Sequence, residues 1–351
     1  MQADYIILGQ GICGTLLSWQ LHRAGEKVVV IDEPAPAASS RVASGLINPV
    51  TGKRLAQSWM FEELIPVALE TYRQLEAELG IPVVRELQLL RYFHSREEES
   101  LFRDRILAGS EYLHLHDDPA LWKHYFNFHL DVGVIEPCWL VQLTALLTSW
   151  RAYLRHRGML FEDSFDWSRC QVSADSVAYG DIIAAKIICC EGPAAVHNPY
   201  FAPLPWSVNK GEALLVSIPG LPREYIYASA LKLVPWKDDL FWLGASYEWK
   251  YPDPDTTDTF RQKATALLDY WLRLPYEVID HLASERPSSV DYKPFAGLHP
   301  FFPSVGILNG MGSKGCSQAP FLADAMKKLL VLDYPLFPEV DVSRFRGILS
   351  R

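Results

Sequence analysis

Residues 5–14 read Tyr5-Ile6-Ile7-Leu8-Gly9-Gln10-Gly11-Ile12-Cys13-Gly14, an apolar run that leads into a GxGxxG motif. The apolar run predicts a buried strand, and the spacing of the leucines that follow the motif predicts a helix. A second apolar run at 28–31 ends in Asp32 and Glu33. Strand, glycine loop, helix, strand and acid together predict a complete βαβ unit, the arrangement that binds a dinucleotide.

The glycine spacing matters because each glycine meets a demand that excludes a side chain. Gly9 permits a sharp turn, Gly11 lets the backbone approach a pyrophosphate, and Gly14 lets the helix pack closely on the strand. The helix that begins there presents free N–H groups and the positive end of its dipole to phosphate. Asp32 is placed to accept hydrogen bonds from ribose hydroxyls, and its charge disfavours NADP. A purely structural turn is the alternative interpretation.

A second glycine motif occurs near the other end, Gly310-Met311-Gly312-Ser313-Lys314-Gly315, again between an apolar run and a helical pattern. No convincing strand follows that helix, so a second dinucleotide site is not expected. Two interpretations remain open. The motif is either a structural loop or a helix N-terminus that stabilises negative charge on a reduced cofactor.

Composition narrows the class of protein. A length of 351 residues favours two lobes. The net charge is −9 and the sequence has no basic run, so a broad nucleic-acid-binding surface is not indicated. The six cysteines form no CxxC pair, which indicates a reducing compartment. No apolar stretch is long enough to span a bilayer. These features predict a cytoplasmic protein that does not enter a membrane.

Periodicity predicts helices at about 62–79, 139–156, 259–273 and 319–330. Strands are predicted at about 186–190, 213–218, 228–234, 240–247 and 305–309, and short strand-like pieces with charged turns over 83–130. The predicted fold class is α/β and α+β, with a Rossmann-like lobe and an inserted, mainly antiparallel β-sheet lobe. No further side chains at metal-ligand spacing support His114-Leu115-His116 as a metal site, so a polar loop is expected there and no metal site.

Taken together, these motifs resemble the D-amino acid oxidase superfamily of FAD enzymes, which includes glycine oxidase and sarcosine oxidase. The resemblance spans nearly the whole chain. Besides the N-terminal motif, the resemblance rests on residues 43–49, 188–192 and 310–320, and on Arg286-Pro287 with Asp291, Pro294 and Gly297. Residues 244–247 and 312–320 are most similar to one branch. That branch is the oxidase module of the bacterial bifunctional enzyme that matures 5-methylaminomethyl-uridine in tRNA.

The resemblance implies a division into lobes and a set of cofactor contacts. The FAD-binding lobe would comprise 1–81, 131–200 and 286–351, and the substrate lobe 82–130 and 201–285. Gly45, Leu46 and Ile47 would line the flavin with backbone groups. The implied FAD-binding residues are Gly9, Gly11, Gly14, Asp32, Glu33, Ser44, Gly45, Leu46, Ile47, Gly192, Gly310, Met311, Gly312, Ser313, Lys314 and Gly315. No cysteine follows Arg286-Pro287 at the usual attachment point, so noncovalent FAD is expected, with Cys316 the only nearby thiol.

The resemblance also implies residues for the substrate. Arg286 corresponds to the arginine that grips the substrate carboxylate, a task that suits its planar fork, although an interlobe salt bridge is an alternative. Lys232 stands where glycine oxidase has a tyrosine, and it would either hold a second anionic group or be solvated. Tyr247 is a candidate wall of the substrate site. Trp242 occupies the position of an oxygen-activating lysine, so the electron acceptor, oxygen or another, stays open.

The activity that the resemblance implies is oxidation of the C–N bond of an amine or amino acid. A hydride equivalent would pass to flavin N5, and the imine would hydrolyse in water. The first alternative is removal of the carboxymethyl group from a carboxymethylaminomethyl-uridine in tRNA, with a basic rim drawn from Lys53, Arg54, Lys210 and Lys314. The second alternative is a flavin-bound protein without turnover.

Overall fold

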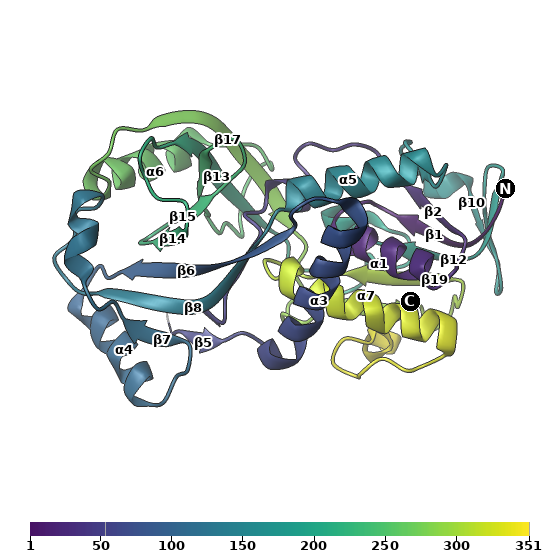
Figure 1. Cartoon of the computed structure of the whole chain (residues 1–351). Coiled ribbons are helices and arrows are strands. Elements are labelled where there is room, and N and C mark those ends of the chain that lie inside the picture. Colours follow the sequence, from purple (N-terminus) through teal and green to yellow (C-terminus); the bar gives the residue numbers. More distant parts are fainter. Residues whose placement is uncertain (53, 351) are drawn as a thin grey trace.

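The computed structural model of the chain describes residues 1–52 and 54–350. It consists of two lobes that lie side by side, each built on one main sheet (Figure 1). We call them the βαβ lobe, which holds the N-terminal strand, and the antiparallel lobe. The chain passes between them several times, as the alternating colours along the sequence show (Figure 1).

The sheet of the βαβ lobe has eight strands in the order β10-β11-β12-β1-β2-β9, with β19 beside β12 and β18 beside β19. Strands β1, β2, β9, β12 and β19 pair in parallel, whereas the pairs β10–β11, β11–β12 and β18–β19 are antiparallel. The strand bounds are β1 Gln2–Leu8, β2 Val28–Ile31, β9 Leu160–Phe161, β10 Cys170–Val172, β11 Val177–Tyr179, β12 Ile182–Cys189, β18 Phe295–Leu298 and β19 Val305–Asn309. The predicted βαβ unit is confirmed, because β1 and β2 are parallel neighbours joined by a helix.

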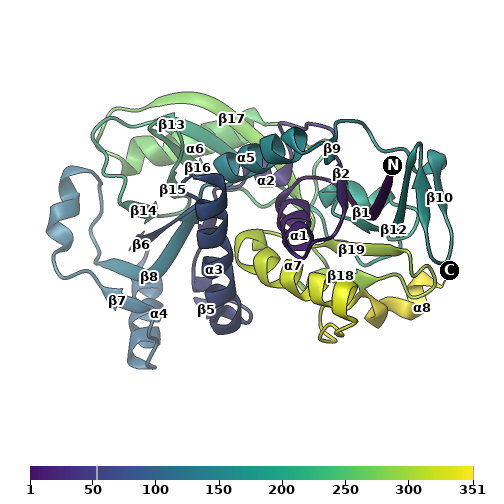
Figure 2. The same cartoon turned by 45° about the vertical axis from the view of Figure 1, so that its right-hand side comes forward.

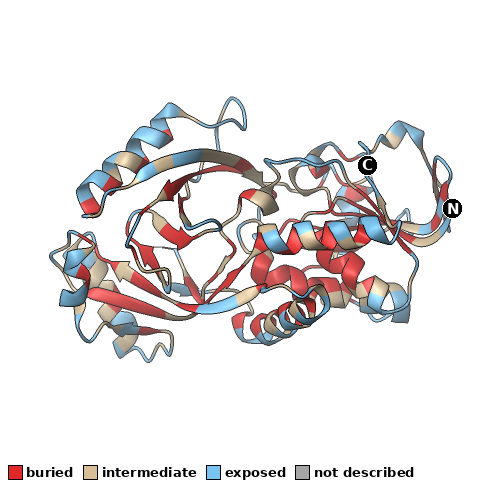
Figure 3. Cartoon of the chain, turned by 45° about the horizontal axis from the view of Figure 1, so that its top comes forward, coloured by how far each residue is buried: buried red, intermediate tan, exposed pale blue. Residues whose placement is uncertain are grey.

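Helices cover this sheet. The long ones are α1 Ile12–Arg23, α3 Phe61–Leu79, α5 Leu143–His156 and α7 Gly315–Leu332, with short α2 Ser39–Val42 and α8 Arg346–Leu349. Figure 2 shows α1, α3 and α7 packed together, and their inward side chains share one apolar core with β1 and β2. In Figure 3 the outer helices alternate between buried and exposed residues, as expected for helices that cover a sheet, whereas α1 is buried along most of its length.

The antiparallel lobe has a nine-stranded sheet in the order β17-β13-β16-β15-β14-β6-β8-β3, with β7 beside β8. Every pair in it is antiparallel except β6 with β14. The bounds are β3 Leu46–Ile47, β6 Val84–Tyr92, β7 Leu113–Leu115, β8 Val132–Val141, β13 Asn209–Ser217, β14 Tyr225–Ala228, β15 Lys232–Pro235, β16 Leu240–Gly244 and β17 Glu277–Arg286. Strands β4 Val50–Thr51 and β5 Ala56–Gln57 form a separate hairpin. The predicted fold class is confirmed.

The two faces of this sheet have different neighbours. Side chains on the outer face, such as Leu214 and Leu243, pack against helix α6, Asp258–Trp271. The inner face carries Ala213 and Trp242 and packs against Val50 from the connector that follows the βαβ unit. The indole Nε1 of Trp242 donates to the Val42 carbonyl at 2.9 Å, which fastens the inner face to the βαβ lobe.

Some elements differ from the predictions. Strand β8, which the sequence division put in the FAD-binding lobe, pairs with β6 and β3 in the antiparallel lobe. The predicted helix at 139–156 begins only at Leu143, because residues 139–141 belong to β8. The predicted strand at 228–234 is two strands, β14 and β15, joined by a turn.

Residues 83–130 also contain a helix, α4 Arg96–Leu107, that the interpretation as strand pieces missed. Its N-cap Ser95 accepts a hydrogen bond from the Glu98 backbone at 3.3 Å. The Ser-x-x-Glu capping pattern was the available signal. None of the helices in the described part of the chain combines the length and apolar character that a transmembrane span requires.

Candidate active site

The first glycine loop joins β1 to α1, and its backbone is too tightly packed for side chains. Gly9 has φ +97°, and a Cβ there would lie 2.6 Å from the Cys190 carbonyl oxygen. A Cβ on Gly14 would overlap the carbonyl oxygen of Gly9. Gly11 is the N-cap of α1 and provides no side chain to cap it. The close-packed loop and the N–H groups in the first turn of α1 together form a cradle that fits a pyrophosphate.

Ser40 lies over the same loop and was not predicted. Its Oγ accepts a hydrogen bond from the Ile12 N–H at 3.0 Å, and it would lie 3.2 Å from a Cβ on Gly11. A hydroxyl here is a further donor for a phosphate oxygen. Ser40 belongs to a proline- and alanine-rich connector, where no motif offset signals its return to the glycine loop.

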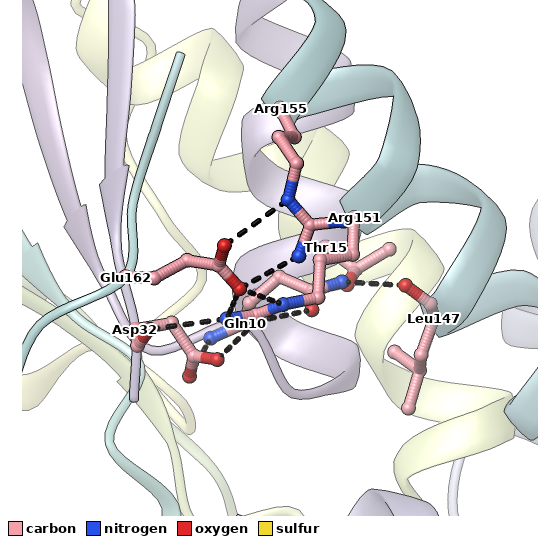
Figure 4. Close-up of polar contacts among 7 residues, drawn as sticks. All are labelled: Gln10, Thr15, Asp32, Leu147, Arg151, Arg155 and Glu162. Atoms are coloured by element: carbon pink, nitrogen blue, oxygen red, sulfur yellow. Dashed lines mark hydrogen bonds and ion pairs between the residues drawn. The ribbon is translucent and has the colours of Figure 1, made fainter. Parts of the chain in front are cut away.

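Asp32 lies at the end of β2 next to the glycine loop (Figure 4). Its Oδ1 accepts the Gln10 backbone N–H at 2.8 Å, and its Oδ2 accepts from Nη1 of Arg151 at 2.5 Å. Each oxygen keeps a second lone pair, so the carboxylate can still accept a ribose hydroxyl. Glu33, the other predicted acid, is exposed.

Arg151 is the centre of a charged network that sequence reasoning missed. The buried guanidinium, on α5, contacts Asp32, Gln10 Oε1 at 3.2 Å and Glu162 Oε1 at 2.9 Å (Figure 4). Hydrogen bonds from Arg155 and Arg151 lower the pKa of Glu162 to about 2. Arg151 thus holds the Asp32 carboxylate at the end of β2. Nothing in the periodicity of α5 distinguished Arg151 from a solvated arginine.

Residues 44–47 form the junction of the lobes. Leu46 and Ile47 make up β3, the edge strand beside β8, so one side of their backbone stays free for a ligand. A Cβ on Gly45 would overlap the Val141 carbonyl oxygen, which explains the glycine there. Ser44 lines a cavity of about 300 Å³ between the start of α5 and the turn after β15.

The second glycine loop lies against the first. A Cβ on Gly315, the first residue of α7, would lie 3.2 Å from Cγ2 of Ile12, the first residue of α1. The Gly312 N–H donates to the Pro287 carbonyl at 2.8 Å, and the Asn309 side chain donates to the Gly192 carbonyl at 2.9 Å. Segments around Gly192, Pro287 and Gly312 therefore meet at the N-terminus of α7. Within this loop Gly310 and Met311 are buried, whereas Ser313 is exposed.

Lys314 reaches from this loop into the interior. Its Nζ lies 3.4 Å from Asn48 Oδ1 and 3.3 Å from Ser58 Oγ, and no carboxylate in residues 1–52 and 54–350 pairs with it. Burial lowers the pKa of Lys314 to about 8, and the charge of Lys232 adds to the effect. The ammonium is therefore near its titration point at physiological pH, unlike a surface lysine.

Arg286, at the end of β17, has only neutral partners. Its Nη1 donates to Asn209 Oδ1 at 2.8 Å and to the Ser246 carbonyl at 3.2 Å. The Tyr247 ring stacks on the guanidinium at 4.3 Å and is otherwise 59% exposed. No ion pair to Arg286 exists among the described residues, so the interlobe salt bridge that the sequence allowed is not formed. Burial lowers the pKa of Arg286.

Lys232 begins β15, opposite Gly244 of β16. No hydrogen bond or ion pair to its Nζ occurs among the residues that the structure describes. Its pKa is lowered, first by burial and then by the charges of Arg91 and Arg286. Lys232 and Arg286 are therefore close enough to repel each other, although they are far apart in the sequence.

The predicted basic rim is not assembled. Lys210 is fully buried, donates to the Asp255 carbonyl at 2.6 Å and lies 3.4 Å from Glu212, so its assignment to a rim is wrong. The alternation of side chains along β13 turns it to the outer face. Arg54 is exposed, Lys314 is inside, and Lys53 lies outside the described residues.

Two further features lie away from this region. Each ring nitrogen of His116 has a neighbouring N–H group, Trp122 Nε1 at 3.0 Å from Nε2 and the Asp118 N–H at 3.1 Å from Nδ1, and one of the two nitrogens accepts in the neutral ring. A cavity of about 530 Å³ lies between α4 and the segment after β7, and it contains none of the predicted site residues. The chemistry that the glycine loops and the unpaired cations suggest is therefore at the lobe junction.

Comparison with known proteins agrees with this geometry. Residues 4–329 match the family described as DAO, FAD dependent oxidoreductase. The chain is 24% identical over 379 residues to the bifunctional protein ThiO/ThiG of Trichormus variabilis, covering 99% of this chain but only 56% of that protein. It is 24% identical to glycine oxidase of Bacillus licheniformis, with 93% of each protein covered.

Solved structures of other proteins share this fold. Iminodiacetate oxidase from a Chelativorans species has a TM-score of 0.77 at 20% identity, over 97% of this chain and 98% of that chain. At that identity the likeness concerns the fold alone, whereas the family match covers most of the sequence. With the glycine cradle, the acid at the end of β2 and this match, the chain belongs to the DAO family of FAD-dependent oxidoreductases.

Proposed function

We propose that this chain oxidises the C–N bond of an amino acid or N-substituted amino acid whose carboxylate is bound by Arg286. The observation that carries the proposal is the isolation of this guanidinium. It is half-buried, it donates to the neutral oxygens of Asn209 and Ser246, and no carboxylate of the described residues forms an ion pair with it. A buried cation without a partner is costly, and a planar carboxylate is the ligand that its fork accepts best.

The rest of the lobe junction suits this reaction. Bound FAD supplies the acceptor for a hydride equivalent at its N5 position. Arg286 orients the substrate, while the N-terminus of α7 and the Lys314 ammonium favour negative charge beside the glycine loops. The substrate amine must be neutral to react, and the cations around it favour loss of its proton. The imine product is then hydrolysed by water, so no acid–base side chain is assigned to that step.

We propose that FAD is held without a covalent bond. Cys316 is the thiol nearest to the second glycine loop, and burial raises its pKa to about 12. The thiolate that would form a bond to the cofactor is therefore disfavoured. The proposed FAD-binding residues remain the two glycine loops with Asp32, Glu33, Gly192 and residues 44–47.

The relatives support an amino-acid-like substrate, because their names include glycine oxidase and iminodiacetate oxidase. The similarity of residues 244–247 and 312–320 to the tRNA-modifying branch keeps a carboxymethylaminomethyl-uridine as the alternative substrate. This modified uridine also presents a secondary amine beside a carboxylate, so Arg286 could bind either candidate substrate. Of the described rim candidates only Arg54 is exposed, which favours a small substrate.

Anaerobic reduction of the bound flavin tests the proposal. The panel is glycine, sarcosine, D-amino acids, the matching amines without a carboxylate, and a tRNA anticodon stem-loop with the modified uridine. Arg286→Leu leaves the substrate carboxylate unpaired, which costs roughly 2–5 kcal/mol, or about 30- to several-thousand-fold in binding. The reduction rate at subsaturating acid substrate should fall by that factor, and Arg286→Lys should recover only part of it.

Two measurements control this experiment. FAD content, determined after release with acid, should equal that of the wild type. The penalty should shrink for amines without a carboxylate, because they offer Arg286 nothing to bind. Equal losses for acids and amines would make Arg286 a structural residue. A flavin that no compound bleaches would favour a flavin-bound protein without turnover.

A further inference from the structure

The inner face of the antiparallel sheet carries two cations in one region. Across the sheet, Lys232 is paired with Gly244, Gly244 with Ala213, and Ala213 with Leu282. Residues paired across antiparallel strands share a face, and so do residues two and four apart along one strand. Arg286 stands four residues after Leu282, so it projects from the same face as Lys232.

The position of the guanidinium confirms this orientation. It lies directly over Gly211, where a Cβ would overlap it, and Gly211 is two residues from Ala213. The row between the two cations consists of the small residues Gly244 and Ala213, with the Trp242 indole lying against Gly244. Small side chains leave the two charged groups as the features that stand out from this part of the face.

The carboxylates adjacent in sequence to Ala213 and Arg286, those of Glu212 and Glu285, are on the other face, whereas the exposed Asp280 shares the register of Leu282. Glu212 faces outward, where it accepts from the Thr257 N–H at 2.6 Å and lies 2.9 Å from His281 Nε2. Glu285 also faces outward and accepts from Tyr251 Oη at 2.5 Å. Strand alternation therefore turns Glu212 and Glu285 to the outer face and leaves Lys232 and Arg286 together on the inner face.

Two further cations lie near Lys232, and only one of them has a carboxylate partner. Arg91 lies in the same row as Lys232, but its Nε donates to Glu98 Oε1 at 2.7 Å, so its charge is compensated. Lys314 enters from the βαβ lobe, and the charge of Lys232 contributes to lowering the Lys314 pKa. Lys232, Arg286 and Lys314 thus make up a group of three cations, none of which forms an ion pair with a carboxylate of the described residues. We call it the cationic cluster.

Such a cluster destabilises the folded protein unless an anion compensates its charge, because each buried unpaired cation is strongly disfavoured. One carboxylate at Arg286 balances one of the three charges. We propose that Lys232 binds a second anionic group, so that the substrate is a secondary amine or amino acid with two anionic groups, one at Arg286 and one at Lys232. This inference rests on the proposed amine oxidation.

The first experiment compares substrates that differ in one charge. N-(carboxyalkyl)glycines with one, two or three methylene groups are compared with the same compounds in which the distal carboxylate is a carboxamide. The wild type should reduce its flavin more efficiently with one of the diacids than with its amide. A charged hydrogen bond predicts a difference of about 10- to 100-fold in the rate at subsaturating substrate.

The second experiment locates that preference. Lys232→Met should abolish the advantage of the diacid over its amide, and Lys232→Arg should restore part of that advantage. Lys237→Met provides a matched control, because Lys237 is an exposed lysine just after β15. It should behave like the wild type. A diacid advantage that survives Lys232→Met, or is absent in the wild type, overturns the inference.

A binding measurement separates this inference from the proposed function. Thioether analogues, in which sulfur replaces the amine nitrogen, cannot be oxidised at a C–N bond. Calorimetric titration should show the dicarboxylate thioether binding about 10- to 100-fold more tightly than its monoamide in the wild type, and equally in Lys232→Met. Dicarboxylate binding without flavin reduction by any amine would contradict only the proposed reaction. Flavin reduction without a preference for two charges would contradict only the second anion site.

Discussion

Charged residues inside this protein fall into two classes. Lys210 and His281 lie 3.4 Å and 2.9 Å from the Glu212 carboxylate on the outer face of the antiparallel sheet, as in a structural cluster. Arg286 and Lys232 have no such anion. Since burying a charge without a partner is costly, an unsatisfied cation is better evidence for a ligand than a satisfied one.

The Asp32 carboxylate has two tasks that one pair of variants can separate. Asp32→Ala removes an acceptor for ribose hydroxyls and a partner of Arg151, whereas Glu162→Gln removes only an Arg151 partner. Asp32→Ala should weaken FAD binding by about 10- to 100-fold, the value of a charged hydrogen bond, without changing the absorbance of the retained flavin. Glu162→Gln should retain wild-type affinity in an equilibrium titration with FAD. Equal losses in both variants would mean that Asp32 acts through Arg151.

At the scale of elements, the βαβ unit depends on how closely α1 lies on the loop after β1. Gly14 is inside α1, where alanine has the better helix propensity. Its Cβ would nevertheless overlap the Gly9 carbonyl oxygen, and backbone cannot move aside as a flexible side chain can. The contact between elements therefore outweighs the propensity of the helix.

Gly14→Ala should consequently lower the free energy of unfolding by about 1–3 kcal/mol and weaken FAD retention, because the loop must shift to admit the methyl group. Gly347→Ala is the matched control. Gly347 is in helix α8, and a Cβ there meets nothing within 4 Å. It should be neutral or stabilising by up to about 1 kcal/mol in chemical denaturation. A Gly14→Ala protein as stable as Gly347→Ala would refute the close approach.

On the scale of the whole molecule, Lys314 links the lobes. It is the N-cap of α7, and its side chain reaches Asn48, just after β3 of the antiparallel sheet. Its pKa falls from 10.5 to about 8 on folding. Below pH 8 the folded and unfolded states both carry the charge, so the cost of burial is fully present. Between about pH 8 and 10.5 the folded state releases a proton that the unfolded state still holds, so stability rises with pH.

Lys314→Met removes this dependence. The variant should be more stable than the wild type at pH 7 by on the order of 3 kcal/mol, and the difference should shrink as pH rises from 8 to 10.5. Chemical denaturation of both proteins across this range measures it, and other titrating groups cancel in the comparison. Lys237→Met, at an exposed position, should differ from the wild type equally at every pH. A constant difference for Lys314→Met would contradict the burial of a charged amine.

Much of the fold was accessible from local patterns. The run at 5–14 and the second strand ending at Asp32 predicted the βαβ unit, which is confirmed, because glycine spacing and apolar periodicity are local properties. Helices α3, α6 and α7 were predicted within a few residues for the same reason. Helix α4 was missed because its charged composition outweighed the capping signal at Ser95 in the interpretation.

The sequence by itself determined the FAD-dependent oxidoreductase family and the residue types of a dinucleotide cradle, because short sequence motifs specify both. Only the tertiary structure decided which charges are paired. Lys210 and Lys232 look alike in sequence, yet strand register turns Lys210 toward Glu212 and Lys232 toward the βαβ lobe beside Arg286. Arg151 reaches Asp32 in the same way, across 119 residues of chain. Pairing of side chains depends on register and on long-range contacts, which no local pattern specifies.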